Sequence, residues 1–167
     1  MFQTARLLLR ELTARDAPFI LDLLNDPSFL RFIGDKGART LDDARRYIAD
    51  GPRASYRENG FGLYLVQLRD SGERLGMCGL VKREALCDVD IGFAFLPRYW
   101  SKGYALEASS AVMRLARTRF RITRVVAITS QDNHGSMRLL RKIGLRFERT
   151  ICLPGQSERV NLFVPPG

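Results

Sequence analysis

Short apolar segments, several of them alternating between apolar and polar positions, recur along the chain between charged or turn-forming residues. Such segments are typical of β-strands, because successive side chains of a strand point to opposite faces. The composition of residues 69–73 and of the Pro154-Gly155 pair predicts two hairpin turns. The predicted strands are residues 6–12, 61–68, 74–81, 89–96, 124–129, 145–153 and 158–164.

Other segments carry apolar residues at helical spacing. Asp16 is a candidate cap for the first predicted helix, Thr40 and Asp43 resemble a capping box at the second, and Gly51-Pro52 should break or kink it. The predicted helices are residues 16–25, 40–57, a segment that opens after the loop 98–105 and runs to about residue 118, and 136–143, which stops at Gly144. The third helix has a candidate buried stripe of Leu106, Val112, Leu115 and Ala116.

The predicted element order is β-α-α-β-β-β-α-β-α-β-β, which indicates a mixed α/β or α+β fold. The length of 167 residues and the lack of an internal linker favour one domain over residues 1–167. No apolar run approaches the roughly 20 residues of a membrane helix, and the N-terminus is not a signal peptide. Three cysteines without metal-ligand spacing (Cys78, Cys87 and Cys152) indicate reduced thiols, no metal site and a cytoplasmic protein.

The formal net charge is +9, which favours an anionic partner: a nucleotide cofactor, an acidic substrate or a nucleic acid. The alternative is a basic, solvated surface without a specific role. No helix-turn-helix, zinc or aromatic-platform motif accompanies the charge, so a nucleic acid is not the expected partner.

Residues 95–107 form the stretch with the most specific chemistry. A strand stops at Pro97, a short loop passes through Gly103, and a helix begins. The first amides of a helix have no partner within it, and the helix dipole is positive there, so such an end binds phosphate if the backbone can approach. Gly103 and Ala105 permit that approach, and Lys102 adds charge. The alternative is an ordinary strand-to-helix turn.

This stretch resembles the pyrophosphate-binding motif, Gln/Arg-x-x-Gly-x-Gly/Ala, of the GCN5-related N-acetyltransferase (GNAT) superfamily. The particular form is similar to the branch of ribosomal-protein N-terminal acetyltransferases, and it departs from that branch at Ser101 and Leu106, where the family has Gly and Thr. The matching stretches, which follow the family order over residues 4–164, are Thr4-Ala5-Arg6-Leu7-Leu8-Leu9-Arg10, Val89-Asp90-Ile91-Gly92-Phe93, Trp100-Ser101-Lys102-Gly103-Tyr104-Ala105, and Asn133-His134-Gly135-Ser136 with residues 139–148.

The resemblance implies a mostly antiparallel sheet with one splayed parallel strand pair, about four flanking helices, and acetyl-CoA as cosubstrate between the splayed strands. The implied cofactor-binding residues are Phe93, Ala94 and Phe95 for the pantetheine arm, Trp100, Ser101, Lys102, Gly103, Tyr104 and Ala105 for the diphosphate, Asn133 for the pantetheine and Lys142 for the adenosine end. Three of these residues also have a structural alternative. Asn133 could cap the last helix, and the side chains of Phe93 and Phe95 could belong to the core.

The resemblance also implies direct attack of an amine on the thioester. Asp90 is the candidate proton acceptor, in place of the family's glutamate, with a salt-bridged carboxylate as the alternative. Ser136 is the candidate proton donor to the thiolate, with a helix-start hydroxyl as the alternative, because the family's other acid, a tyrosine, corresponds to Phe163. His134, the sole histidine, is expected at the surface, which disfavours a Cys–His hydrolase.

The function predicted from the sequence is acetyl transfer to a primary amine, either a protein N-terminus or a small molecule. Asp90 and Phe163 depart from the family pattern, which leaves a non-catalytic acyl-CoA-binding module as the alternative. The acceptor should be selected by the first two helices and by residues 154–157, where the family varies most. A homodimer is open, because dimers occur in the family.

Overall fold

The computed structural model describes residues 1–167, and its strands and helices follow the predicted order with additions. The strands are β1 (Phe2–Gln3), β2 (Leu7–Arg10), β3 (Leu63–Leu68), β4 (Arg74–Val81), β5 (Val89–Phe95), β6 (Val125–Ser130), β7 (Arg146–Cys152) and β8 (Arg159–Val164). The α-helices are α1 (Ala17–Asn25), α2 (Pro27–Phe32), α3 (Leu41–Ile48), α4 (Ala54–Asn59), α5 (Tyr104–Thr118) and α6 (His134–Lys142).

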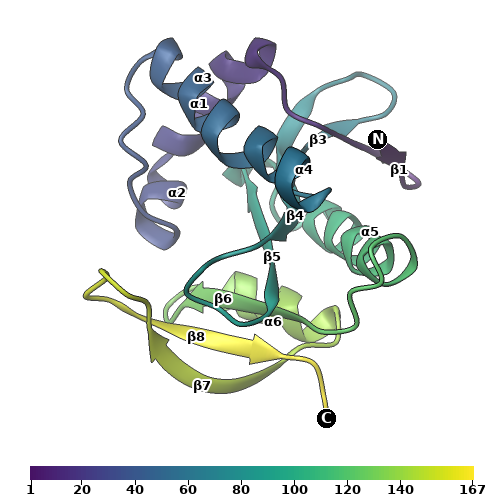
Figure 1. Cartoon of the computed structure of the whole chain (residues 1–167). Helices are drawn as coiled ribbons and strands as arrows, with labels where there is room; N and C mark the ends of the chain where they lie inside the picture. The colour runs from purple at the N-terminus through teal and green to yellow at the C-terminus, as the bar shows by residue number, and fades with distance from the viewer.

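One 8-stranded sheet runs through the molecule in the order β1-β2-β3-β4-β5-β6-β8-β7 (Figure 1). Every neighbouring pair is antiparallel except β5 and β6, which are parallel. The expected mixed, mostly antiparallel sheet with one parallel pair is therefore confirmed. A parallel pair needs a crossover connection, and here α5 provides it between β5 and β6.

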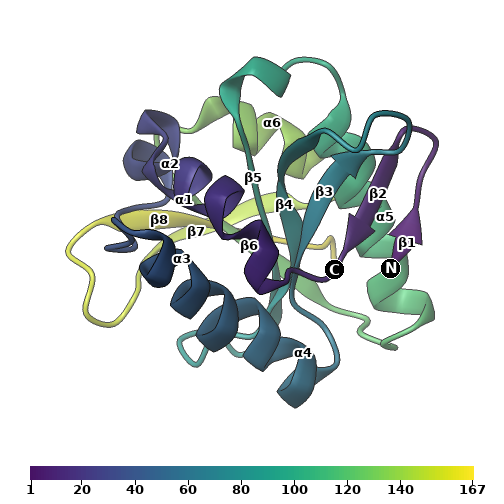
Figure 2. The ribbon, with the colours of Figure 1, turned by 90° about the horizontal axis from the view of Figure 1, so that it is seen from above.

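Helices cover both faces of the sheet: α1 to α4 gather on one face, and α5 and α6 lie on the other (Figure 2). The centre of the sheet is therefore shielded on both sides, and β4 is buried from Leu75 to Leu80. A strand buried on both faces has a continuous rather than alternating apolar pattern, as this one does. No helix of the structure is both long and apolar enough to span a bilayer.

Several local predictions are confirmed by specific contacts. The capping box at α3 is present: the Thr40 side chain accepts a hydrogen bond from the amide of Asp43 at 3.1 Å, and the Asp43 carboxylate accepts one from the amide of Thr40 at 3.0 Å. Gly51-Pro52 lies in a π-helical turn, Ala49–Arg53, which interrupts the regular helix between α3 and α4. Gly144 ends α6 with φ of +95°.

Other local predictions are wrong in instructive ways. The sequence pattern missed β1 and α2, which are too short to show a period. Asp16 precedes α1, but its side chain does not cap that helix; it points into the protein and contacts Arg10 and Thr13. The buried stripe of α5 consists of small residues beside Val112 and Met113, while Leu106 and Leu115 are only half-buried, because α5 packs closely on the sheet through its alanines.

Candidate active site

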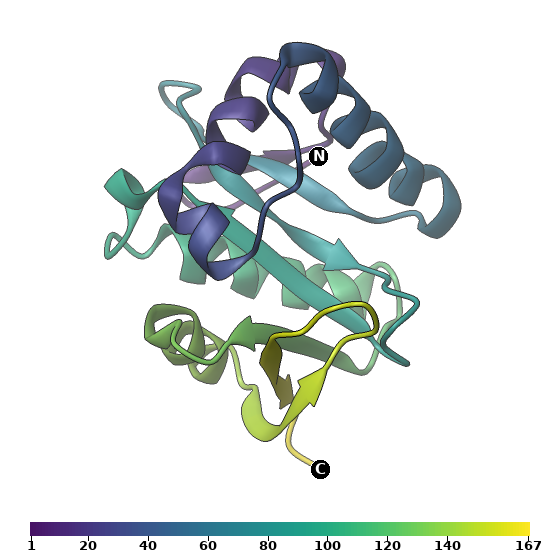
Figure 3. The ribbon, with the colours of Figure 1, turned by 90° about the vertical axis from the view of Figure 1, so that its left-hand side faces the viewer.

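The parallel strands β5 and β6 pair over only two positions, Val89 with Val125 and Asp90 with Val126. Beyond them the strands separate, and β6 pairs with β8 from Ala127 onward (Figure 3). From Ile91 to Phe95 the edge of β5 that faces β6 consequently has no strand partner. A strand edge of this kind offers main-chain donors and acceptors to an extended ligand.

A cleft of ≈ 470 Å³ opens where the two strands separate. It brings together five of the candidate residues, from strand β5 and from the start of helix α6, which are distant in the sequence. Its lining also includes Phe29 and Phe32 of α2 and Leu153 and Gln156 of the β7–β8 connection. Gln156 lies in the segment that the sequence assigned to acceptor selection, whereas α2 was not among the predicted helices. The candidate residues that line the cleft are Asp90, Phe93, Ala94, Asn133 and Ser136.

Asp90 lies on the floor of this cleft with 1% of its surface exposed. Its two carboxylate oxygens accept hydrogen bonds from Nε of Arg83 at 3.1 and 3.2 Å, so the salt bridge left open by the sequence is present. Burial raises the pKa of Asp90, and the charge and hydrogen bond of Arg83 oppose that rise without cancelling it. A carboxylate with a raised pKa is a better proton acceptor than an ordinary aspartate.

Tyr47 of α3 also lines the cleft, but it is not a base at neutral pH. Burial raises the pKa of its hydroxyl to about 12, against a smaller lowering by Arg83. The hydroxyl therefore keeps its proton, and among these two groups Asp90 is the one able to accept a proton.

Asn133 and Ser136 meet at the first turn of α6. Oδ1 of Asn133 accepts a hydrogen bond from the amide of Ser136 at 3.1 Å, so Asn133 does cap this helix. The cap fixes the orientation of the Asn133 side chain at the cleft wall. His134 is exposed beside them, as expected.

The loop before α5 has the backbone geometry of an anion cradle. Ser101 and Gly103 both adopt left-handed conformations, with φ of 61° and 82°. From Ser101 to Leu106 no amide donates a hydrogen bond to another protein group. These donors surround the positive end of a 15-residue helix, the arrangement that binds phosphate groups. The left-handed conformation at residue 101 also explains why the family has glycine there.

Strand β5 links this loop to the cleft, but not every candidate residue lines the cleft. Nε1 of Trp100 donates a hydrogen bond to the carbonyl of Phe95 at 2.8 Å, so one lone pair of that carbonyl is already used within the protein. Lys142 lies at the exposed C-terminal end of α6. The residues that lie outside the cleft lining are Phe95, Trp100, Ser101, Lys102, Gly103, Tyr104, Ala105 and Lys142.

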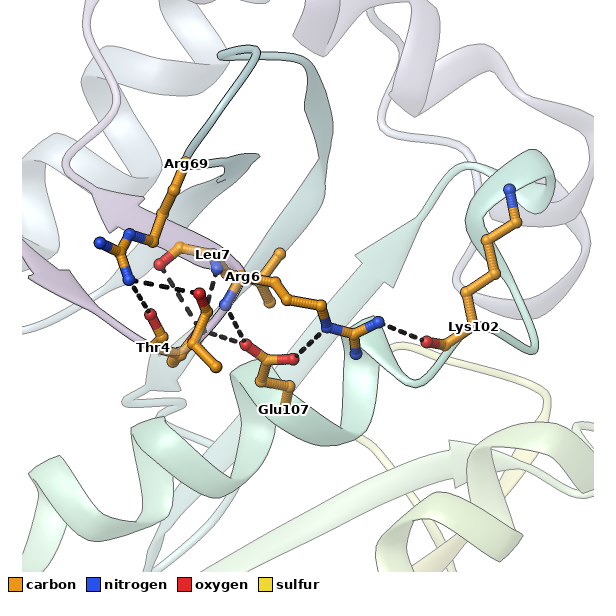
Figure 4. A network of polar contacts seen from close by, with 7 residues as sticks. Thr4, Arg6, Leu7, Arg69, Lys102 and Glu107 are labelled. Atoms are coloured by element: carbon orange, nitrogen blue, oxygen red, sulfur yellow. Dashed lines mark hydrogen bonds and ion pairs between the residues drawn. The ribbon is translucent and has the colours of Figure 1, made fainter.

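Two groups of contacts at the site were missed from the sequence. Arg83, the partner of Asp90, lies in the connection between β4 and β5, where no pattern marks it. Arg6 and Glu107 join the N-terminal segment to the loop before α5 (Figure 4). Arg6 lies within one stretch that resembles the family and Glu107 lies beside another, and this resemblance was the signal that could have pointed to them.

Comparison with known proteins agrees with this geometry. The family model described as acetyltransferase (GNAT) domain matches residues 6–146. An uncharacterized N-acetyltransferase of Bacillus subtilis (strain 168), YnaD, is 28% identical over 157 residues, covering 93% of this chain and 89% of the relative. An acetyltransferase structure from Agrobacterium tumefaciens str. C58 superposes with a TM-score of 0.83 at 22% identity, covering 99% of this chain and 94% of that chain.

A second solved structure is RimL, a ribosomal L7/L12 alpha-N-protein acetyltransferase in complex with coenzyme A. It superposes with a TM-score of 0.81 at 18% identity, covering 96% of this chain and 94% of that chain. At these identities the superpositions show a shared fold.

Proposed function

The chain belongs to the GNAT acetyltransferase family and is an N-acetyltransferase, and we propose that it moves an acetyl group from acetyl-CoA to a primary amine by direct attack. The observation that carries this proposal is the course of β5. One strand runs from Asp90 on the cleft floor to a loop whose amides have no protein acceptor. A diphosphate held at the loop would direct its thioester arm along the unpaired edge of β5 toward Asp90.

The residues at the loop fit a diphosphate. The amides of Ser101 to Ala105 supply donors, Lys102 supplies charge, and at Gly103 a Cβ would come within 3.2 Å of the Arg6 guanidinium. Along the strand edge, the backbones of Phe93 and Ala94 would bind the pantetheine arm, with Asn133 opposite. Lys142 would contact the adenosine end from α6.

The chemistry assigned to this chain is proton transfer. As the amine nitrogen bonds to the acetyl carbon, the carbon–sulfur bond breaks, and the amine proton must leave. Asp90 accepts this proton, directly or through one water, and its raised pKa suits that role. Ser136 lines the same cleft, and its hydroxyl donates a proton to the departing thiolate.

The acceptor is proposed to be either a protein N-terminus or a small-molecule amine, entering between α2 and the β7–β8 connection. The test is release of free thiol from acetyl-CoA in the presence of peptides with different N-terminal residues, polyamines and other small amines. At least one amine should give thiol release together with an acetylated product. Binding of acetyl-CoA without transfer to any amine would instead indicate a non-catalytic acyl-CoA-binding module.

The placement of the diphosphate is tested by Gly103→Glu, which puts a side chain and a negative charge among the amides. Coenzyme A binding should weaken at least about 100-fold, which corresponds to about 2.8 kcal/mol. Gly60→Glu is the matched control, because Gly60 has a similar φ of +77° and its added Cβ meets nothing within 4 Å. Equal affinities of the two variants would refute this placement.

A further inference from the structure

One guanidinium spans the gap between the N-terminal segment and the loop before α5. Nε of Arg6 donates to Oε2 of Glu107 at 2.7 Å, and Nη1 donates to the carbonyl of Lys102 at 3.0 Å (Figure 4). Its plane lies over the ring of Tyr104, with Cζ 4.4 Å from the centroid. The remaining nitrogen, Nη2, is the atom nearest to the position of a Cβ at Gly103. Arg6 thus contacts Lys102 and Tyr104, the residues on either side of Gly103.

The other end of this link is fixed at α5. Besides Arg6 Nε, the Glu107 carboxylate accepts hydrogen bonds from the amide of Arg6 at 2.8 Å and from the hydroxyl of Thr4 at 2.5 Å. Although burial raises the pKa of Glu107, these hydrogen bonds outweigh burial and lower it. The carboxylate stays ionised at neutral pH and accepts all three donors.

The N-terminal segment is itself held by the β3–β4 hairpin. Nη1 of Arg69 donates to the carbonyls of Thr4 and Ala5 at 2.9 and 3.2 Å, and the amide of Arg69 donates to the carbonyl of Arg6 at 2.9 Å. Arg6 therefore extends from a fixed backbone.

The loop needs such support, because little within it fixes its shape. Ser101 and Gly103 have left-handed conformations, and the amides between them have no protein acceptor. A loop held in its binding shape avoids the ordering cost that a free loop incurs when a ligand binds. The Arg6 contacts go to the carbonyl of Lys102 and the ring of Tyr104, which leaves the amides free.

We propose that Arg6 is a positioning residue for the donor: anchored on Glu107, it holds residues 102–104 so that their amides converge on the diphosphate. This inference rests on the proposed function. It is specific to donors that carry a diphosphate, because Arg6 acts on the loop and not on the strand edge or on Asp90.

The test compares two thioester donors, acetyl-CoA and S-acetyl-pantetheine, which lacks the diphosphate and the nucleoside. Arg6→Ala should raise KM for acetyl-CoA about tenfold, with kcat much less affected. The ratio of kcat/KM for acetyl-CoA to that for S-acetyl-pantetheine should fall by about the same factor. Equal losses with both donors would show a general structural role and would overturn the proposal.

A second variant separates geometry from charge. Arg6→Lys keeps the charge but cannot bond Glu107 and Lys102 together or cover Tyr104, so it should resemble Arg6→Ala. Wild-type affinity in Arg6→Lys would show a purely Coulombic contribution and would overturn positioning. Arg45→Ala is the matched control, because Arg45 is an exposed arginine of α3 whose ion-pair partner is Asp42 and not a residue of the loop.

Calorimetric titration of coenzyme A tests the proposed function separately from the role of Arg6. Failure of the wild type to bind coenzyme A would refute the proposed function itself. Binding by the wild type with equal affinity in Arg6→Ala would refute only the role of Arg6. Circular dichroism melting of each variant shows whether an observed loss of binding accompanies a loss of fold, and a loss seen only in an unfolded variant would count against positioning.

Discussion

Two aspartates of this chain are almost completely buried beside arginine, yet their environments differ. Asp16, between β2 and α1, is 0% exposed, and Asp90, in the cleft, is 1% exposed. Asp16 accepts two hydrogen bonds from Arg10 at 2.8 and 2.9 Å and one from the amide of Thr13 at 2.9 Å, with Arg74 at 3.4 Å. Asp90 has Arg83 as its one side-chain partner.

The number of hydrogen-bond and charge partners decides whether the pKa of each carboxyl is raised or lowered. Burial raises the pKa of both carboxyls, but at Asp16 the hydrogen bonds and charges of Arg10, Thr13 and Arg74 outweigh burial and lower it. At Asp90, burial outweighs Arg83 and the pKa is raised. A buried carboxylate with many partners stabilises the fold, whereas one with few partners is poised to take up a proton.

The largest expected effect is on turnover, in Asp90→Asn. Asparagine cannot accept the amine proton, so kcat should fall about 10³-fold, within the usual range for a general base. The control is Asp88→Asn, two residues earlier, where the carboxylate pairs with Arg124 at 3.0 Å outside the cleft lining. A thiol-release assay at saturating acetyl-CoA measures both, and comparable kcat values would remove Asp90 from the mechanism.

The next effect is on stability, in Asp16→Asn. Loss of the charge leaves Arg10 without its buried partner, and the free energy of unfolding should fall by about 3 kcal/mol. Asp35→Asn is the control, because its ion pair with Arg39 is exposed and its loss should hardly change the urea midpoint. If Asp16→Asn unfolds at the wild-type urea concentration, the structural role of Asp16 is wrong.

A smaller effect is expected for Ser136→Ala. A thiolate is a good leaving group even without full protonation, so kcat should fall only about tenfold. The exposed Ser110 of α5 provides the control variant, Ser110→Ala. Unchanged turnover in Ser136→Ala would leave its hydroxyl with no part in proton transfer.

The smallest expected effect is on the pH dependence of the free energy of unfolding. The two carboxyls should change this free energy in opposite directions as the pH rises. Asp16 has a lowered pKa, so its contribution is complete above the unfolded pKa of about 3.9 and is lost as pH falls below it. Asp90 has a raised pKa, so stability falls as pH rises from about 3.9 through its folded pKa.

Urea unfolding across this pH range measures both dependences. The stability difference between the wild type and Asp16→Asn should shrink on acidification, while Asp90→Asn should lack the decline that the wild type shows on raising the pH. Differences that are independent of pH in both variants would contradict the assignment.

Features that depend on neighbouring residues could be predicted from the sequence, and features that depend on contacts between distant segments could not. The loop proposed to bind the diphosphate is contiguous, and its glycine, helix start and strand end can all be recognised within residues 95–107. The strands β3, β4, β5 and β6 could be predicted for a similar reason, since each is a local pattern. Asp90 and Ser136 were proposed by resemblance, and the structure places both on one cleft.

The partners of these residues could not be predicted, because they depend on contacts between distant segments. Glu107 meets Arg6 across 101 positions, and Arg83 reaches Asp90 from an irregular connection. Asp16 looked like a helix cap because local spacing cannot show that Arg10 and Arg74 converge on it. Tertiary contacts override the local preference there.

Calorimetric titration of the wild-type chain with acetyl-CoA is the decisive test of whether the loop before α5 binds the diphosphate of the donor. We expect one site with a dissociation constant on the order of micromolar, and loss of that site in Gly103→Glu. No measurable binding by the folded wild type, or equal binding by Gly103→Glu, would contradict it.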